Sequence, residues 1–179
     1  MSKKLLFLFL SVYSLCIIGN SYSQPLQGPF DLTPQNINMK FSLKYQITQT
    51  SYIEVPDTLN HRLGTAIGTG IALFNDSISI PVKSYFVYDY VDGNGNFIDY
   101  YVFTFPNGSS FGVQALGIAQ GSNATGNNPL FQSTTRTTVG TGDFANFIAT
   151  GVMSGNRNIV VENNAQVRLT FDMKQIIQP

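Results

Sequence analysis

Apolar and polar residues alternate along the chain from residue 37 onward. Between residues 37 and 47 every second position is apolar: Ile37, Met39, Phe41, Leu43, Tyr45 and Ile47. Because successive side chains of a β-strand point to opposite faces, this pattern predicts a strand with one buried face. No later stretch keeps an apolar period of three to four residues over four turns, so we expect little helix.

Further strands are predicted at short intervals. They span residues 64–74, 83–90, 97–105, 110–119, 130–139, 144–153 and 166–173, with a short one at 159–161. Asn-Gly and Asp-Gly steps within residues 92–96 and 106–108 predict tight hairpin turns, because these residues tolerate positive φ angles. Eight or nine short strands separated by turn signals indicate an antiparallel sandwich or barrel.

The first residues have the three parts of a secretory signal peptide. Lys3 and Lys4 precede an apolar run over residues 5–18, and small residues lead to a cleavage site after Ser23. We therefore expect a protein that is secreted to the extracellular space, or to the periplasm of a bacterium, with no membrane span after cleavage. The predicted organisation is a signal peptide at 1–23, an extended lead-in with three prolines at 24–36, and one domain at 37–179.

Composition removes several classes of site and partner. The single cysteine, Cys16, lies in the signal peptide, so the mature chain has no disulfide, thiol nucleophile or cysteine-bound metal. Without Lys3 and Lys4, eight basic residues stand against ten acidic ones, and no basic patch predicts nucleic-acid binding. Abundant Asn, Thr, Ser, Gly, Tyr and Phe with few charges are typical of an extracellular β-sheet protein.

Several fragments of the chain, in order, resemble the allene oxide cyclase and dirigent barrel superfamily. The strongest is Gly140-Thr141-Gly142 with Phe144, followed by Ala149-Thr150-Gly151, which is similar to the family's penultimate hairpin. The other fragments are the first amphipathic strand and the segments 64–70, 103–114, 126–131 and 167–171. The spacing after Phe144 is two residues longer than the family's, and an arginine common there is missing, so no polar pocket residue is carried over.

The resemblance implies a fold and a general activity. The fold is an all-β, antiparallel, eight-stranded barrel, or one of eight or nine strands. In that family the barrel holds a small hydrophobic or aromatic molecule, steers its cyclisation or coupling without a cofactor, and often forms a homotrimer. The residues of this chain leave three alternatives open. It catalyses a reaction as a cofactor-free cyclase or isomerase, it only steers the reaction of a bound molecule, or it only binds that molecule.

The strands on either side of the turn at 92–96 are unusually aromatic. Alternation must send half of these rings inward, either Tyr85 with its period-two partners or Phe86 with Tyr88 and Tyr90. The inward set forms a plain core or lines a cavity for a flat ligand, since an eight-stranded barrel can hold one small molecule. The candidate ligand-binding residues are Tyr85, Tyr88, Tyr90, Tyr101, Phe103 and Arg136.

Other polar residues give weaker predictions. His61 is the only histidine and is expected in solvent, in a loop between two strands. No metal site is predicted, because oxygen ligands at residues 92–99 lack the glycine and glutamate of an EF-hand. Five charged residues fall inside predicted strands and are expected on exposed faces, although an inward one would be an acid–base candidate: Asp89, Asp99, Arg136, Arg168 and Asp172. In a eukaryote, candidate glycosylation sites are Asn75, Asn107 and Asn123.

Two functions follow from these patterns. The first is a secreted dirigent-like or allene-oxide-cyclase-like barrel with a small hydrophobic or aromatic ligand in its lumen. The second is a non-catalytic recognition or adhesion module that has a filled interior and uses polar loops such as residues 121–128. An open lumen would favour the first function, and a filled lumen would favour the second.

Overall fold

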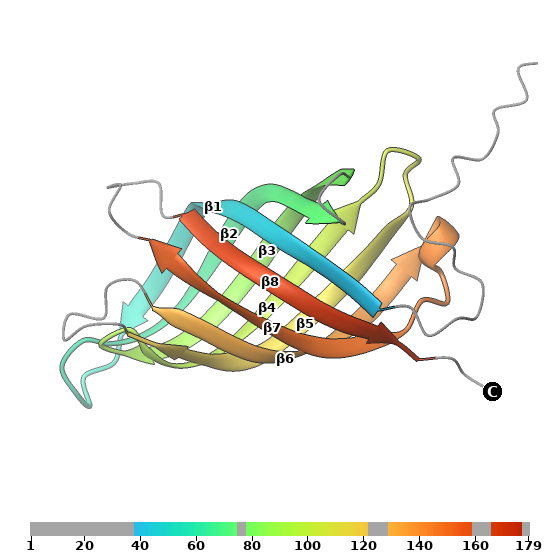
Figure 1. Ribbon diagram of the computed structural model, residues 1–179. Coiled ribbons are helices and arrows are strands. Elements are labelled where there is room, and N and C mark those ends of the chain that lie inside the picture. Colours follow the sequence, from blue (N-terminus) through green and yellow to red (C-terminus); the bar gives the residue numbers. More distant parts are fainter. Residues whose placement is uncertain (1–37, 75–77, 122–128, 159–165, 177–179) are drawn as a thin grey trace, which may run out of the picture.

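The computed structural model describes residues 38–74, 78–121, 129–158 and 166–176, and these residues form one closed barrel. Each strand pairs antiparallel with its neighbour in sequence, and the first strand closes on the last (Figure 1). The strands are β1 (Asn38–Glu54), β2 (His61–Phe74), β3 (Ile78–Val91), β4 (Asn94–Thr104), β5 (Ser110–Gln120), β6 (Leu130–Thr141), β7 (Ala149–Asn158) and β8 (Gln166–Gln175). The eight-stranded antiparallel barrel is the predicted fold. The predicted signal peptide, lead-in and short strand at 159–161 lie outside the described residues.

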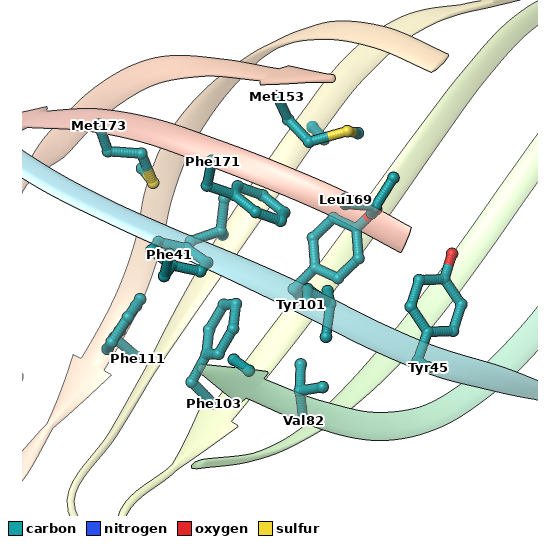
Figure 2. Close-up of a cluster of buried hydrophobic side chains, with 14 of the residues drawn as sticks. Phe41, Tyr45, Val82, Tyr101, Phe103, Phe111, Met153, Leu169, Phe171 and Met173 are labelled. Atoms are coloured by element: carbon teal, nitrogen blue, oxygen red, sulfur yellow. The ribbon is translucent and has the colours of Figure 1, made fainter. Parts of the chain in front are cut away.

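Alternation along the strands decides which side chains fill the barrel. On β1, Phe41 is buried and pairs with Phe74 of β2 on one side and Phe171 of β8 on the other. Its ring centroid lies 4.5 Å from that of Phe74 and 4.6 Å from that of Phe171. Figure 2 shows Phe41, Phe171 and Phe103 gathered inside the barrel. Such aromatic contacts add to the stabilisation from burial alone.

A short 3-10 helix, η1 (Gly142–Phe144), covers one end of the barrel. The Phe144 ring lies 4.6 Å from Phe105 and 5.0 Å from Phe111, centroid to centroid. Here the predicted strand at 144–153 is wrong at its start, because β7 begins only at Ala149. Gly142 has a φ of +58°, which favours glycine and turns the chain out of the strand direction. We call this end, with its five packed phenylalanines, the closed end: Phe74, Phe105, Phe111, Phe144 and Phe147.

The hairpin between β3 and β4 is as tight as its sequence predicted. Only Asp92 and Gly93 separate the two strands, with φ angles of 49° and 76°. Two successive positive φ values match the right-handed twist of the flanking strands. This turn fixes the β3–β4 register, in which Ser84 pairs with Tyr101 and Phe86 with Asp99.

The inner face of β2 carries only small side chains along most of its length. The inward positions before Phe74 are Gly64, Ala66, Gly68, Gly70 and Ala72. The space that they leave is filled by rings from neighbouring strands. A Cβ atom on Gly64 would collide with the Tyr88 ring, and one on Gly68 with the Tyr45 ring. Two tyrosines from β1 and β3 therefore occupy the volume next to β2.

Candidate functional site

Among the described residues, one carboxyl group lies inside the barrel. Asp99 of β4 is fully buried at an inward position between Phe97 and Tyr101. Ser84 Oγ donates to Asp99 and lies 2.9 Å from Oδ1 and 3.1 Å from Oδ2. Tyr45 Oη lies 3.5 Å from Asp99 Oδ2, a long donor contact. We call Asp99, Ser84, Tyr45 and Tyr101 the acid cluster. Figure 2 shows Tyr101 beside the packed phenylalanines and Tyr45 beyond it.

Burial sets the protonation behaviour of the acid cluster. Loss of solvent raises the pKa of Asp99 to about 6, against the opposing effect of hydrogen bonds from Tyr101 and Ser84. Burial, followed by the nearby Asp99 charge, raises the pKa of Tyr45 and of Tyr101 well above the ordinary tyrosine value. Near neutral pH the two phenols therefore stay protonated. Asp99 is the member of this cluster that can both lose and regain a proton in that range.

Four of the six predicted ligand residues point into the barrel. Tyr101 and Phe103 are fully buried, Tyr90 is 8% exposed, and Tyr88 is partly exposed. Of the two aromatic sets that alternation allowed on β3, the structure therefore places the Phe86, Tyr88 and Tyr90 set inside. Phe103 lies toward the closed end, where its ring stacks on Phe111 with a centroid distance of 4.9 Å.

The other two predicted ligand residues, Tyr85 and Arg136, lie on the outer wall. Tyr85 is 43% exposed, because its neighbour Ser84 takes the inward position on β3. Arg136 follows the buried Thr135, and its Nε donates to Gln114 Oε1 at 2.8 Å. Gln114 Nε2 in turn donates to the Tyr100 hydroxyl at 2.6 Å. Arg136 thus belongs to a hydrogen-bonded row on the outside of the barrel and does not line the lumen.

The end of the barrel opposite the closed end is less tightly covered, and we call it the open end. Its inward aromatic residues are Phe86, Tyr88, Tyr90, Phe97 and Phe131. Arg157, partly buried, completes it from β7. Four buried polar atoms here and along β6 have no hydrogen-bond partner among the described residues: Tyr90 Oη, Ser133 Oγ, Thr135 Oγ1 and Arg157 Nε. Native proteins normally satisfy such atoms with water or a ligand.

A small cavity joins the open end to the acid cluster. Its volume is about 10 Å³, which is near the minimum for one water molecule. It is lined by Tyr45, Ile47, Ala66, Gly68, Ser84, Phe86, Phe131, Arg157 and Val167. Between these lining residues there is therefore room for about one water molecule, and a larger guest at this place requires the rings at the open end to move.

His61 was predicted to be solvated in a loop, and the structure differs. It begins β2, and its side chain is only 14% exposed. Its Nδ1 lies 2.5 Å from Asp57 Oδ1 and its Nε2 lies 2.7 Å from Asp89 Oδ1. These hydrogen bonds, that to Asp57 first and that to Asp89 second, raise the pKa of His61. The histidine joins the β1–β2 turn to β3 on the outside of the barrel.

Of the five charged residues predicted within strands, four are exposed and one is buried. Asp89, Arg136, Arg168 and Asp172 are exposed as expected. The expectation fails for Asp99, although the sequence held a signal for its burial. Phe97, Tyr101 and Phe103 share its parity, and a residue in phase with three aromatic residues belongs to the apolar face. Ser84 and Arg157 were not singled out, and the predicted β7 strand stopped at residue 153, before Arg157.

The remaining sequence predictions concern glycosylation sites, the polar loop, membrane spans and metal sites. Asn107 is exposed in its turn, and its Nδ2 donates to Asp143 Oδ2 at 2.7 Å. Asn75 and Asn123 lie outside the described residues, as does most of the polar loop at 121–128. In the described part of the chain, no helix is long and apolar enough to cross a membrane. The same residues contain no cluster of three or more His, Cys, Asp or Glu side chains suited to a metal ion.

Of the comparisons with known proteins, only the comparison of structures gives matches to this chain. No family model matches the sequence, and no curated protein matches it. A pterocarpan synthase dirigent protein is similar in structure with a TM-score of 0.50 at 14% identity, covering 83% of this chain and 98% of that one. A conserved protein of unknown function from Rhodopseudomonas palustris has a TM-score of 0.48 at 16% identity, covering 81% and 100%. A β-barrel-like protein from Acinetobacter baumannii has a TM-score of 0.49 at 11% identity, covering 80% and 97%.

These likenesses concern the course of the backbone. At 14% identity the dirigent protein shares few side chains with this chain, so the comparison bears on the fold and not on the site. The predicted eight-stranded antiparallel barrel is therefore confirmed, and the course of its backbone is similar to that of a dirigent protein.

Proposed function

We propose that this protein is a secreted dirigent-like barrel that binds a small hydrophobic or aromatic molecule at the open end of its lumen. In this proposal Asp99 is the acid–base group that steers cyclisation or coupling of the bound molecule. The observation that carries it is the full burial of the Asp99 carboxyl beside Ser84 and Tyr45. A buried carboxyl with a pKa near the working pH is typical of a functional site.

Packing alone does not explain Asp99. An apolar side chain of similar size would fill the same volume without the cost of burying an ionisable group. With a pKa raised to about 6, Asp99 can give a proton to a ligand oxygen and take one back when a ring closes. Such a cycle conserves the proton and needs no cofactor. The phenols of Tyr45 and Tyr101 stay neutral and can donate hydrogen bonds to the same ligand.

The open end can make room for a ligand by moving side chains rather than strands. Tyr88 lies over Gly64 and is partly exposed, so its ring can rotate outward into solvent. That movement would uncover the small inner face of β2 at Gly64 and Ala66. Phe86, also partly exposed, borders the same space. The barrel wall itself stays intact, because its strands are paired around the whole circumference.

Filling this space with a larger side chain should weaken ligand uptake. We expect the apolar fluorescent probe N-phenylnaphthylamine to bind the purified protein and to bind Ala66→Leu more weakly, by roughly tenfold or about 1.4 kcal/mol. Ala66 is buried and lines the cavity, so added methyl groups take up the ligand's volume. Fluorescence titration measures the affinity, and circular dichroism checks that the variant is folded.

Thr65→Leu is the matched control for this experiment. Thr65 precedes Ala66 on β2 and is exposed on the outer wall, so the same leucine there should leave uptake unchanged. Absence of probe uptake by the unaltered protein would contradict lumen binding. Equal loss in both variants would place the probe on the outer surface.

The second candidate function is a recognition or adhesion module with a filled interior. The observation that favours it is the cavity of only about 10 Å³. In that case Asp99 would be a structural residue, and the working surface would be the loops. The probe titration separates the two functions, because a recognition module has no reason to open its lumen.

We propose further that the protein assembles as a homo-oligomer, a trimer in the family that it resembles. Exposed apolar residues lie together on the outer wall of three adjacent strands, and we call them the β3–β5 patch: Tyr85, Val87, Ile98, Tyr100, Leu116 and Ile118. Val87, Ile98 and Leu116 are direct neighbours across the sheet. A contiguous apolar surface of this kind supports association, and a second copy of the chain offers a matching one.

A charge in the β3–β5 patch should dissociate the oligomer. We expect light scattering at micromolar concentration to give a multiple of the chain mass for the unaltered protein and the monomer mass for Ile98→Lys. Burying an unpaired ammonium group costs several kcal/mol. Val139→Lys is the control, because Val139 is 78% exposed and lies outside the patch. A monomeric unaltered protein would refute the assembly.

A further inference from the structure

Arg157 is a cation at the open end with no anionic partner among the described residues. It lines the cavity together with Phe86 and Phe131, and its Nε is buried without a hydrogen-bond partner. The four ion pairs formed by the described residues do not include it. A guanidinium has five N–H donors and no acceptor, and it binds carboxylates through two parallel hydrogen bonds. An unpaired arginine in such a place is therefore suited to an anion.

The groups around Arg157 are hydrogen-bond donors as well. Its positive charge acts on the hydroxyls of both Tyr88 and Tyr90, partly offsetting the effect of burial, which raises the pKa of each. Both phenols therefore keep their protons at neutral pH. The Tyr90 hydroxyl is buried without a partner. Arg157 and the two protonated phenols form a site rich in hydrogen-bond donors, and Asp99 is the carboxylate among the described residues whose charge reaches Tyr90.

The interior of the lumen determines which way round a ligand must lie. Asp99 lies farther from the open end than Arg157 and already accepts a hydrogen bond from Ser84. Its negative charge would repel an anionic group. Between the two polar ends the wall consists of rings and small residues, such as Phe86, Phe131 and Ala66. An anionic head therefore fits at Arg157 and an uncharged aromatic body fits inward, with its far end toward Asp99.

We infer that the open end is a binding site for flat apolar molecules that carry a carboxylate or similar anionic head, held by Arg157 with the head outward. The inference rests on the proposed function, because it presupposes that the lumen admits a guest. It adds the charge of the ligand and its orientation. The reacting part of the molecule lies at Asp99, and the head group anchors it at the mouth.

Competition against a neutral probe tests the anchor. Bound N-phenylnaphthylamine is displaced by naphthaleneacetate or by naphthaleneethanol, which share a ring system and differ in the carboxylate. We expect the unaltered protein to prefer the acetate by roughly tenfold. In Arg157→Gln that preference should fall by roughly the same factor, while the affinity for the alcohol stays unchanged. Arg168→Gln, which removes an exposed cation from the outer wall, should behave as the unaltered protein.

The outcomes separate the two proposals. If the unaltered protein takes up no N-phenylnaphthylamine, the lumen-binding function fails and the anchor fails with it. If the probe binds but the unaltered protein shows no preference for the acetate, the anchor alone is overturned, and this comparison needs no variant. An equal loss of preference in Arg157→Gln and Arg168→Gln would also overturn it, because a general effect of net charge would then suffice.

Discussion

Replacing Phe103 with alanine should lower the free energy of unfolding by about 3–5 kcal/mol. The Phe103 side chain is fully buried where the rings of four strands meet. It stacks on Phe111 with a centroid distance of 4.9 Å and meets Phe41 edge-on at 5.3 Å. Truncation removes the buried area and these ring contacts, and it leaves a cavity that a paired, closed barrel cannot collapse to fill.

The neighbouring residue provides the control for that loss. Val102→Ala also truncates an apolar side chain of β4, but Val102 is 37% exposed on the outer wall, so we expect a change of less than about 1 kcal/mol. Chemical denaturation followed by circular dichroism measures both values. Similar losses for the two variants would mean that the assignment of inner and outer faces on β4 is wrong.

The strand pattern could be predicted because apolar alternation is strong wherever one face is aromatic. The inner face of β3 could not be chosen on apolarity, since Tyr85 points outward and Phe86 points inward on the same strand. The positions of the charged residues on β3 do distinguish its two faces. Lys83 and Asp89 share the parity of Tyr85, and unpaired charges are costly in a barrel lumen, so that parity had to face solvent. Weighing charge and apolarity together would have assigned the inward set.

The residues of the site were harder to predict for two physical reasons. Asp99 was expected outside because a buried carboxyl is destabilising, which is the property that makes it informative once it is found inside. Arg157 lies beyond the predicted end of its strand, because β7 begins and ends later than the pattern of residues 144–153 suggested. The turn around η1 shifted that boundary, and its geometry depends on Phe144 packing against the closed end rather than on local propensity.

Asp99 should make the stability of the barrel fall as the pH rises. Its pKa is about 6 in the folded protein, against an ordinary value of 3.8, so the folded state binds the proton more tightly than the unfolded state. Below about pH 3 both states are protonated and this stabilising contribution is fully present. Between that pH and the folded pKa the unfolded chain loses the proton first. The contribution is then lost, up to about 3 kcal/mol in all, since each pKa unit corresponds to about 1.36 kcal/mol.

The Asp99→Asn variant isolates this effect, because asparagine does not titrate. His61, whose raised pKa also makes stability fall with rising pH, is present in both proteins and cancels in the difference. The stability of the unaltered protein minus that of Asp99→Asn should therefore decrease by about 2.5 kcal/mol between about pH 4 and about pH 8. Asp172→Asn, on the exposed outer wall, controls for the loss of one negative charge. A difference that stays constant with pH would show that water reaches Asp99, and that the lumen is open enough to hydrate its carboxylate. The size of the decrease thus reports whether Asp99 lies in a dry pocket. In such a pocket a bound molecule competes for the proton with protein groups and not with water.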